Sequence, residues 1–339
     1  MKHSYRLIFW GGLSLLLGLV LVAFAIGRYP ITPQMLAEIV YAKVANVPHS
    51  YTSTVETVLF QLRLPRILVA MMVGSALCVA GICFQGVFQN PMAAPDILGA
   101  SNGAAFGAAL AILWRLSSGG ITILAFGFSL LSIWLVFTIS KFTRGKQVLS
   151  IILVGLMVSN VFSAATSFVK LVADPSDQLP AITFWLMGSL NNSDMGDVCF
   201  LAIALLVGIV PLFLLRWQMN VLTLHDDEAR AIGVHTKKLQ VVVILAATLL
   251  TAASVSVSGM IGWVGLLIPN LCRRVVGSDY RKLLPTSMIY GSAFLLLVDT
   301  VARTMFTSEI PLSILTAFIG APFFLYLMTN YGGGPWGSK

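Results

Sequence analysis

Residues 196–215 read GDVCFLAIALLVGIVPLFLL, and after Asp197 this stretch contains no charged side chain. A transmembrane helix needs about 20 mostly apolar residues, so the stretch is long enough to cross a bilayer. Inside lipid the backbone must satisfy its own hydrogen bonds, which favours a helix. The stretch therefore predicts one membrane-spanning helix, and it serves as a template for finding others in the chain.

Nine other segments have the same character, which predicts an all-α, polytopic transmembrane bundle of about ten spans. The chain is 58% hydrophobic and 10% charged, whereas soluble globular domains carry about 25% charged residues. The first span can also be read as a signal peptide, because Ala23-Phe24-Ala25 resembles a cleavage site, but its length favours a retained helix. The predicted spans are residues 7–27, 66–86, 95–113, 121–140, 148–169, 196–215, 239–258, 260–276, 285–302 and 312–329.

The basic residues predict that both termini lie in the cytoplasm. With the N-terminus inside, 14 of the 21 lysines and arginines fall on the cytoplasmic side, as the positive-inside rule expects. This bias also accounts for the net charge of +8. We predict no nucleic-acid binding, because no basic stripe with interleaved aromatic residues is present. The four cysteines lack metal-ligand spacing, so no metal site is predicted.

The connector at about residues 216–238 is the most informative cytoplasmic feature. Its acidic residues suit the positive N-terminus of a helix, and its glycine suits a helix C-terminal stop. The pattern predicts a short capped helix outside the membrane, which fits a solvated connector and a docking element equally well. The residues concerned are Asp226, Asp227, Glu228, Ala229, Arg230, Ile232 and Gly233.

Three arginines lie at the outer ends of predicted spans. Arg63 and Arg66 flank Leu64-Pro65, and Arg303 follows Asp299 by one helical turn. The Asp299–Arg303 spacing fits an ion pair within one helix, and arginines at span ends often reach toward the membrane interface. The functional alternative is a cationic outer surface that receives an acidic partner.

The fifth predicted span carries polar residues on one side. Ser159, Ser163, Thr166 and Lys170 are spaced by four, three and four residues, which places them on one helix face. Such a stripe predicts either hydrogen bonds to neighbouring helices or a wet translocation pathway, and we favour the pathway. The candidate pathway residues are Ser159, Asn160, Ser163, Thr166 and Ser167.

Motifs that would supply energy or catalysis are missing from the sequence. There is no GxxxxGK[ST] phosphate-binding loop, no HExxH zinc motif and no GxSxG nucleophile elbow. Acidic residues are nearly absent from the predicted spans, which argues against proton coupling because such acids usually mark proton relays. We therefore predict that the chain is not an enzyme by itself and that energy comes from another subunit.

Several motifs, in order along nearly the whole chain, resemble the permeases of type II ABC importers, which take up iron–siderophore complexes, heme and vitamin B12. The motifs are Arg63-Leu64-Pro65-Arg66, Gln85, Asn90-Pro91-Met92-Ala93, Pro95, Leu98-Gly99, Asn102-Gly103-Ala104, Trp185-Leu186-Met187-Gly188-Ser189-Leu190, Ala229-Arg230-Ala231-Ile232-Gly233, Gly262-Trp263-Val264-Gly265-Leu266-Leu267-Ile268-Pro269, Asp279-Tyr280-Arg281-Lys282-Leu283-Leu284-Pro285, Asp299-Thr300-Val301-Ala302-Arg303 and Gly320-Ala321-Pro322-Phe323-Phe324.

The resemblance implies a multi-pass protein of the bacterial cytoplasmic (inner) membrane, with residues 1–339 as a single permease domain. It implies a homodimer that works with two ATPase subunits, which bind ATP and Mg, and with one extracytoplasmic substrate-binding protein. The segment 226–233 matches the coupling helix that docks on the ATPase, and Arg63, Arg66 and Arg303 match arginines that pair with glutamates of the binding protein. The fifth helices would line the pathway. The cytoplasmic gate region would contain Asn90, Pro91, Met92 and Ala93.

The sequence departs from the family pattern at two positions and leaves the cargo open. Asn270 stands where the family usually has His, and Trp263 stands where Phe is common. We predict an iron–siderophore complex as the cargo, with heme, vitamin B12 or molybdate as alternatives. An ion-coupled carrier and a non-transporting receptor or scaffold are the competing functions.

Overall fold

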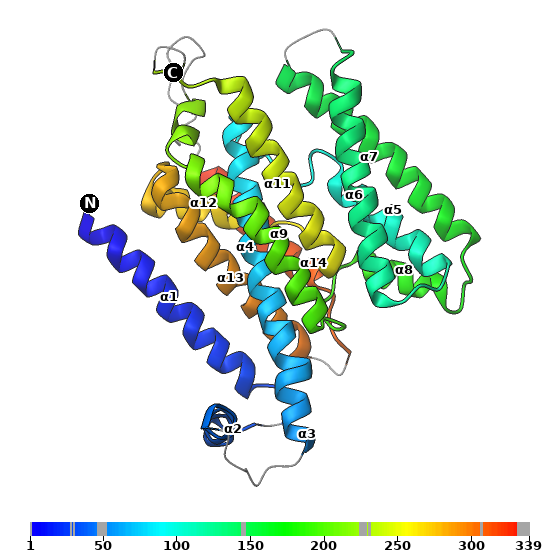
Figure 1. The fold of residues 1–339 in the computed structure, drawn as a ribbon, viewed down its shortest axis with the longest axis vertical. Helices are drawn as coiled ribbons and strands as arrows, with labels where there is room; N and C mark the ends of the chain where they lie inside the picture. Colours follow the sequence, from blue (N-terminus) through cyan, green and yellow to red (C-terminus); the bar gives the residue numbers. More distant parts are fainter. Residues whose placement is uncertain are drawn as a thin grey trace.

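In the computed structural model, every regular element of the described residues is a helix (Figure 1). The structure describes residues 2–27, 29, 31–45, 53–143, 147–223, 229, 232–305 and 308–330. The all-α helical bundle predicted from the sequence is therefore confirmed for this part of the chain. The helices, in order, are α1 (Lys2–Ala25), α2 (Pro33–Ala45), α3 (Ser53–Glu56), the π-helix η1 (Thr57–Arg63), α4 (Leu64–Val87), α5 (Ala100–Leu113), α6 (Ser118–Ser140), α7 (Gln147–Val172), α8 (Gln178–Leu186), α9 (Met195–Leu215), the 3-10 helix η2 (Gln218–Thr223), α11 (Thr236–Ser258), α12 (Val264–Val276), α13 (Tyr280–Thr304) and α14 (Leu312–Asn330).

Each of the ten predicted spans contains one of these helices. Seven described helices are long and apolar enough to cross a membrane, and two further apolar helices, α5 and α14, are shorter. The remaining predicted span corresponds to α12, which has 13 residues and contains Pro269. The number of ten spans and the cytoplasmic position of both termini stay predictions.

The helices differ from the predicted segments at two places. The second span is part of a helix of 34 residues, Thr54–Val87, in which the π-helical turn η1 precedes Pro65 at the start of α4. Proline lacks the N–H that a continuous α-helix would need there, and local π turns accommodate such a break. Helix α8 lies between the fifth and sixth predicted spans and ends at Leu186, and Gly188 after it adopts φ 75°.

Helix α2 was not predicted, although its sequence contains a start signal. Thr32 precedes Pro33, the first helical residue, and the Thr32 Oγ1 accepts a hydrogen bond from the Met35 N–H at 3.2 Å. A threonine cap followed by proline at the first position is a common helix start. The segment escaped the search because it is too short and too polar to span a membrane.

Helix α4 forms the centre of the bundle, where it packs against α9, α11, α12 and α13 (Figure 1). Most of its side chains are buried, and glycines allow neighbouring backbones to approach closely. A Cβ added to Gly81 would lie 1.8 Å from the Gly265 carbonyl oxygen of α12, and one added to Gly74 would lie 2.3 Å from the Gly291 oxygen of α13. Small residues at such crossings are typical of membrane helix packing.

Two groups of helices flank this centre. Helices α5, α6, α7 and α8 pack together on one side and contact α11 through α5 and α6, while α1 lies at the opposite edge against α13 (Figure 1). The Tyr290 hydroxyl of α13 donates a hydrogen bond to the Ile8 carbonyl of α1 at 3.1 Å. In this arrangement the predicted docking arginines and the predicted gate region lie at or near ends of η1, α4 and α13, and the candidate pathway residues lie on α7.

Candidate functional site

Arg66 lies in a compact ion cluster formed by α4, α13 and the segment before α14. Its guanidinium contacts Asp299 of α13 at 2.8 Å and Glu309 at 2.9 Å. Each of these carboxylates accepts hydrogen bonds from two nitrogens of the guanidinium. The Asp299 side chain is 1% exposed and that of Arg66 is 11% exposed. Asp299, for which the sequence suggested an ion pair with Arg303, forms its ion pair with Arg66 instead.

Arg63 and Arg303 are also buried, and both contact the end of α1. The Arg63 guanidinium donates to the carbonyls of Phe24 and Tyr29, and the Arg303 guanidinium donates to the carbonyl of Ala23. The structure thus brings the three predicted docking arginines to one end of the bundle. They have partners within the chain rather than forming the exposed cationic surface that the sequence suggested. Their docking role stays a prediction.

The predicted gate region follows α4 as a compact turn. The Asn90 side chain accepts the Met92 N–H at 2.9 Å, and the Asn90 carbonyl accepts the Ala93 N–H at 3.0 Å. Asn270 of α12 donates from Nδ2 to the Pro91 carbonyl at 3.0 Å and to the Leu266 carbonyl at 2.8 Å. Asn270, noted from the sequence only as a departure from the family pattern, therefore holds this loop against α12.

Gln89, which sequence reasoning missed, stands immediately before the gate region. Its φ is 47°, a left-handed conformation that costs a residue other than glycine about 1–2 kcal/mol. Its side-chain Nε2 donates to the Leu222 carbonyl of η2 at 2.8 Å. The sequence signal was weak, because a glutamine at the end of a helix is ordinary and the contact joins residues far apart in the chain.

Helix η2 is also attached to the start of α13. The Asn220 Nδ2 donates to Asp279 at 3.0 Å, and the Asn220 Oδ1 accepts the Tyr280 N–H at 3.0 Å. Burial alone would raise the pKa of the Asp279 carboxyl, but hydrogen bonds from Arg281 and Asn220 outweigh this effect and hold that pKa below its ordinary value. The carboxylate is therefore ionised at neutral pH and able to accept both bonds.

The candidate pathway residues of α7 divide between two adjacent faces. Ser159 and Thr166 are buried, whereas Asn160, Ser163 and Ser167 are exposed. Ser159 lies beside Gly99 at the start of α5, and the Thr166 hydroxyl donates to a carbonyl of its own helix at 2.8 Å. The exposed polar residues, with spacings of three and four, are the ones that can face a pathway.

The predicted coupling segment is only partly described. Asp226, Asp227, Glu228 and Arg230 lie outside the described residues. Ala229 is buried, Ile232 is exposed, and Gly233 adopts φ 81°. The Val234 N–H donates to the Ala229 carbonyl at 3.0 Å, a pattern found where a helix ends at a left-handed glycine. These described residues agree with the predicted helix stop.

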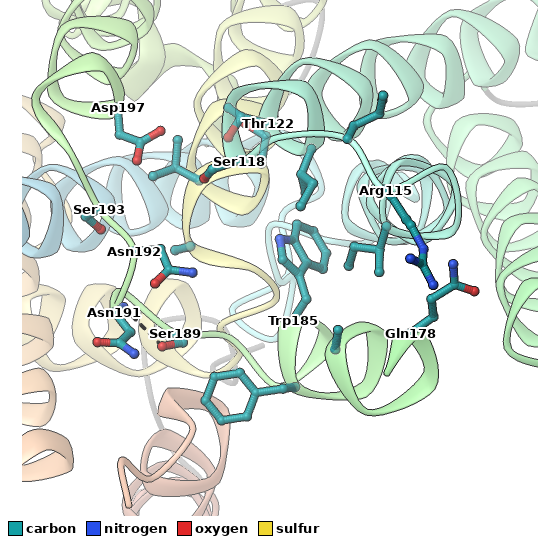
Figure 2. Close-up of a pocket in the computed structure, with 18 of the residues that line it drawn as sticks. Arg115, Ser118, Thr122, Gln178, Trp185, Ser189, Asn191, Asn192, Ser193 and Asp197 are labelled. Carbon is teal, nitrogen blue, oxygen red and sulfur yellow. Dashed lines mark hydrogen bonds between the residues drawn. The ribbon is translucent and has the colours of Figure 1, made fainter. Parts of the chain in front are cut away.

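A cavity of about 570 Å³ opens at the α8 end of the bundle, apart from the predicted sites. Figure 2 shows Trp185 in the middle of its lining, with Arg115 and Gln178 on one side and Asn191 and Asn192 on the other. The Arg115–Asp177 ion pair is long, at 4.0 Å, and both side chains are exposed. The lining mixes hydroxyl, amide and both signs of charge, so it does not indicate a particular ligand.

Comparisons with known proteins match nearly the whole chain. A model of the FecCD transport family matches residues 15–330. The molybdate import system permease protein MolB of Haemophilus influenzae is 40% identical over 95% of this chain and 95% of its own length. A permease protein named for iron chelatin transport in Helicobacter pylori is 38% identical, over 81% and 83% of the two chains.

A solved structure gives the same result for the fold. This structure, of a metal-chelate type ABC transporter in an inward-facing conformation, superposes with a TM-score of 0.85 and 39% sequence identity. The match covers 95% of this chain and 99% of the other. The arrangement of helices described above is thus shared with a chain of that transporter over nearly the whole of both chains.

Proposed function

Because this chain belongs to the FecCD transport family of ABC permeases, we propose that it is the membrane-spanning subunit of an ATP-driven importer of metal-containing solutes. It is a multi-pass protein of the inner membrane. The observation that carries the proposal is the family match over residues 15–330, together with the shared fold. We propose that residues 1–339 form one permease domain.

The proposed assembly contains two copies of this chain, two ATPase subunits and one extracytoplasmic binding protein. ATP and Mg would bind to the ATPase, and this chain would bind no cofactor. ATP binding would draw the segments 226–233 together and tilt the helices, which opens the path to one side of the membrane at a time. The exposed face of α7, with Asn160, Ser163 and Ser167, supports a path between the two copies.

An ion-coupled carrier is less well supported. Acidic side chains within spans usually mark proton or ion relays, and Asp299 is an acid of this kind. It is almost fully buried and forms an ion pair with Arg66 at 2.8 Å, so its charge is satisfied within the bundle. An ion-paired carboxylate of this type suits a structural contact between helices better than a proton relay.

Docking of the binding protein is proposed to involve Arg63, Arg66 and Arg303. Glutamine in place of Arg63 or Arg303 keeps an N–H donor for the carbonyls that these arginines contact, whereas Arg66→Gln removes the charge that pairs with the Asp299 and Glu309 carboxylates. We expect the affinity for the binding protein to fall by about tenfold, or about 1.4 kcal/mol, in each variant. Arg115→Gln is the matched control, because this arginine is exposed at the outer loop between α5 and α6. Unchanged affinity in variants that remain folded at the assay temperature would remove the docking role.

The cargo is proposed to be an iron–siderophore complex, as the sequence predicts. The Helicobacter pylori relative named for iron chelatin transport supports this choice. Molybdate is the second candidate, because the relative named for it is 40% identical over 95% of both chains. Heme and vitamin B12 remain alternatives within the same machinery.

Stimulation of ATP hydrolysis distinguishes these cargoes. The assembled transporter, with its own binding protein, is offered a ferric siderophore, molybdate, heme or cobalamin, and ATP turnover is measured for each. We expect the true cargo to raise the rate above that of the cargo-free binding protein. Stimulation by molybdate alone would replace the iron–siderophore proposal and leave the importer assignment intact.

A further inference from the structure

The conformation of Gln89 is unusual for its position. A left-handed residue after a helix is most often glycine, because a side chain there is strained. Gln89 keeps φ 47° and still carries a long side chain. Strained residues persist where the surrounding structure holds them, and they are concentrated at sites with a function. The side chain of Gln89 donates the 2.8 Å hydrogen bond to the Leu222 carbonyl.

The loop Asn90–Ala93 is thereby held from two sides. On one side Gln89, the residue before it, is bonded to η2, and on the other Asn270 of α12 is bonded to the Pro91 carbonyl at 3.0 Å. Arg273, which is buried, donates to the Asn270 Oδ1 at 3.2 Å and fixes the orientation of the amide. The Asn270 bond ends on a main-chain carbonyl of the loop, and the Gln89 bond ends on a main-chain carbonyl of η2.

Helix η2 is well placed to move this loop. It ends at Thr223, directly before the segment proposed to dock on the ATPase. Asn220 joins η2 to the start of α13 through Asp279 and Tyr280. A displacement of η2 therefore acts on two points, the start of α13 and the residue that precedes the gate region.

We infer that Gln89 is a positioning residue that transmits movement of η2 to the loop Asn90–Ala93, so that ATP turnover and opening of the cytoplasmic end are linked. This inference rests on the proposed function. The observation that supports it is the hydrogen bond from the side chain of Gln89, which lies beside the loop, to η2, which ends directly before the coupling segment. Two sites linked through a physical contact give an energetic coupling that a single substitution can change.

The test compares two variants in the full transporter reconstituted in vesicles. Gln89→Gly removes the bridge and suits the left-handed backbone, so it should fold at least as well as the wild type. Gln89→Glu keeps the shape of the side chain, but its carboxylate cannot donate to the Leu222 carbonyl. Cargo uptake, ATP hydrolysis and melting temperature are measured on the same preparations.

We expect both variants to hydrolyse ATP at nearly the wild-type rate and to import less cargo for each ATP, by about two- to thirty-fold. Unchanged uptake per ATP in the folded variants would overturn the inference. So would equal losses of uptake and hydrolysis, which indicate a merely structural role. Failure of the wild-type transporter to import cargo with ATP would instead refute the proposed function, so the two failures are distinguishable.

Discussion

Replacing Arg66 by alanine is expected to lower the free energy of unfolding by about 3–5 kcal/mol, the usual cost of removing one partner from a buried ion pair. The substitution leaves Asp299, which is 1% exposed, without its 2.8 Å partner and also releases Glu309. The cluster joins α4, α13 and the segment before α14, so three parts of the bundle lose a shared contact. Denaturant titration in detergent micelles measures the effect.

Arg115→Ala provides the matched control for this substitution. Arg115 also pairs with an aspartate, but the distance is 4.0 Å and its side chain is 72% exposed. Exposed pairs contribute about 0–1 kcal/mol, so stability should change little. Equal losses in the two variants would show that the Arg66 cluster is not a buried structural contact.

Replacing Gly81 by alanine is expected to destabilise the protein at the crossing of α4 and α12. The new methyl group would lie 1.8 Å from the Gly265 carbonyl oxygen, and a backbone atom cannot move aside as a flexible side chain can. Overpacking of a core costs about 1–3 kcal/mol, and the rigid neighbour places this change toward the upper end. The melting temperature in detergent and the yield of folded protein report the loss.

Gly127→Ala is the control for this second prediction. Gly127 lies within α6, and a Cβ there meets no atom within 4 Å. Alanine is favoured over glycine in a helix by about 0.5–1 kcal/mol, so this variant should be as stable as the wild type or more stable. A loss comparable to that of Gly81→Ala would contradict the role assigned to the close helix crossing.

The helices could be predicted from the sequence because their signal is local. Long apolar runs such as residues 196–215 have one stable solution in lipid, so every predicted span contains a helix. The ends of the helices were less predictable, because local backbone geometry can extend a helix beyond its apolar run. The π-helical turn before Pro65 is an example. Helix α2 shows the opposite case, since its cap at Thr32 is a clear local signal in a segment without the length of a span.

The contacts of the candidate sites could not be predicted, because they join distant parts of the chain. Glu309 contacts Arg66 across 243 residues, and Gln89 contacts Leu222 across 133. Nothing in the local pattern of either residue indicates its partner. The sequence placed the arginines at the ends of spans, but the burial of Arg63 and Arg303 depends on where the end of α1 packs.

The polar stripe of α7 shows the same limit on a smaller scale. Helical spacing grouped Ser159, Ser163 and Thr166 on one face, but in the structure Ser159 and Thr166 are buried and Ser163 is exposed. Gly155 and Ser159 pack closely on the start of α5, where a Cβ on Gly155 would lie 2.8 Å from the Ile97 carbonyl oxygen. This close approach turns Ser159 inward and leaves Asn160, Ser163 and Ser167 exposed.

The most direct test of the central claim is cargo accumulation in sealed vesicles that contain this chain and its ATPase, with ATP enclosed and binding protein outside. We expect accumulation of a radiolabelled ferric siderophore, or of labelled molybdate, to require hydrolysable ATP and to persist when proton and sodium gradients are collapsed. Accumulation that follows an ion gradient and ignores ATP would contradict it, because the chain would then act as an ion-coupled carrier.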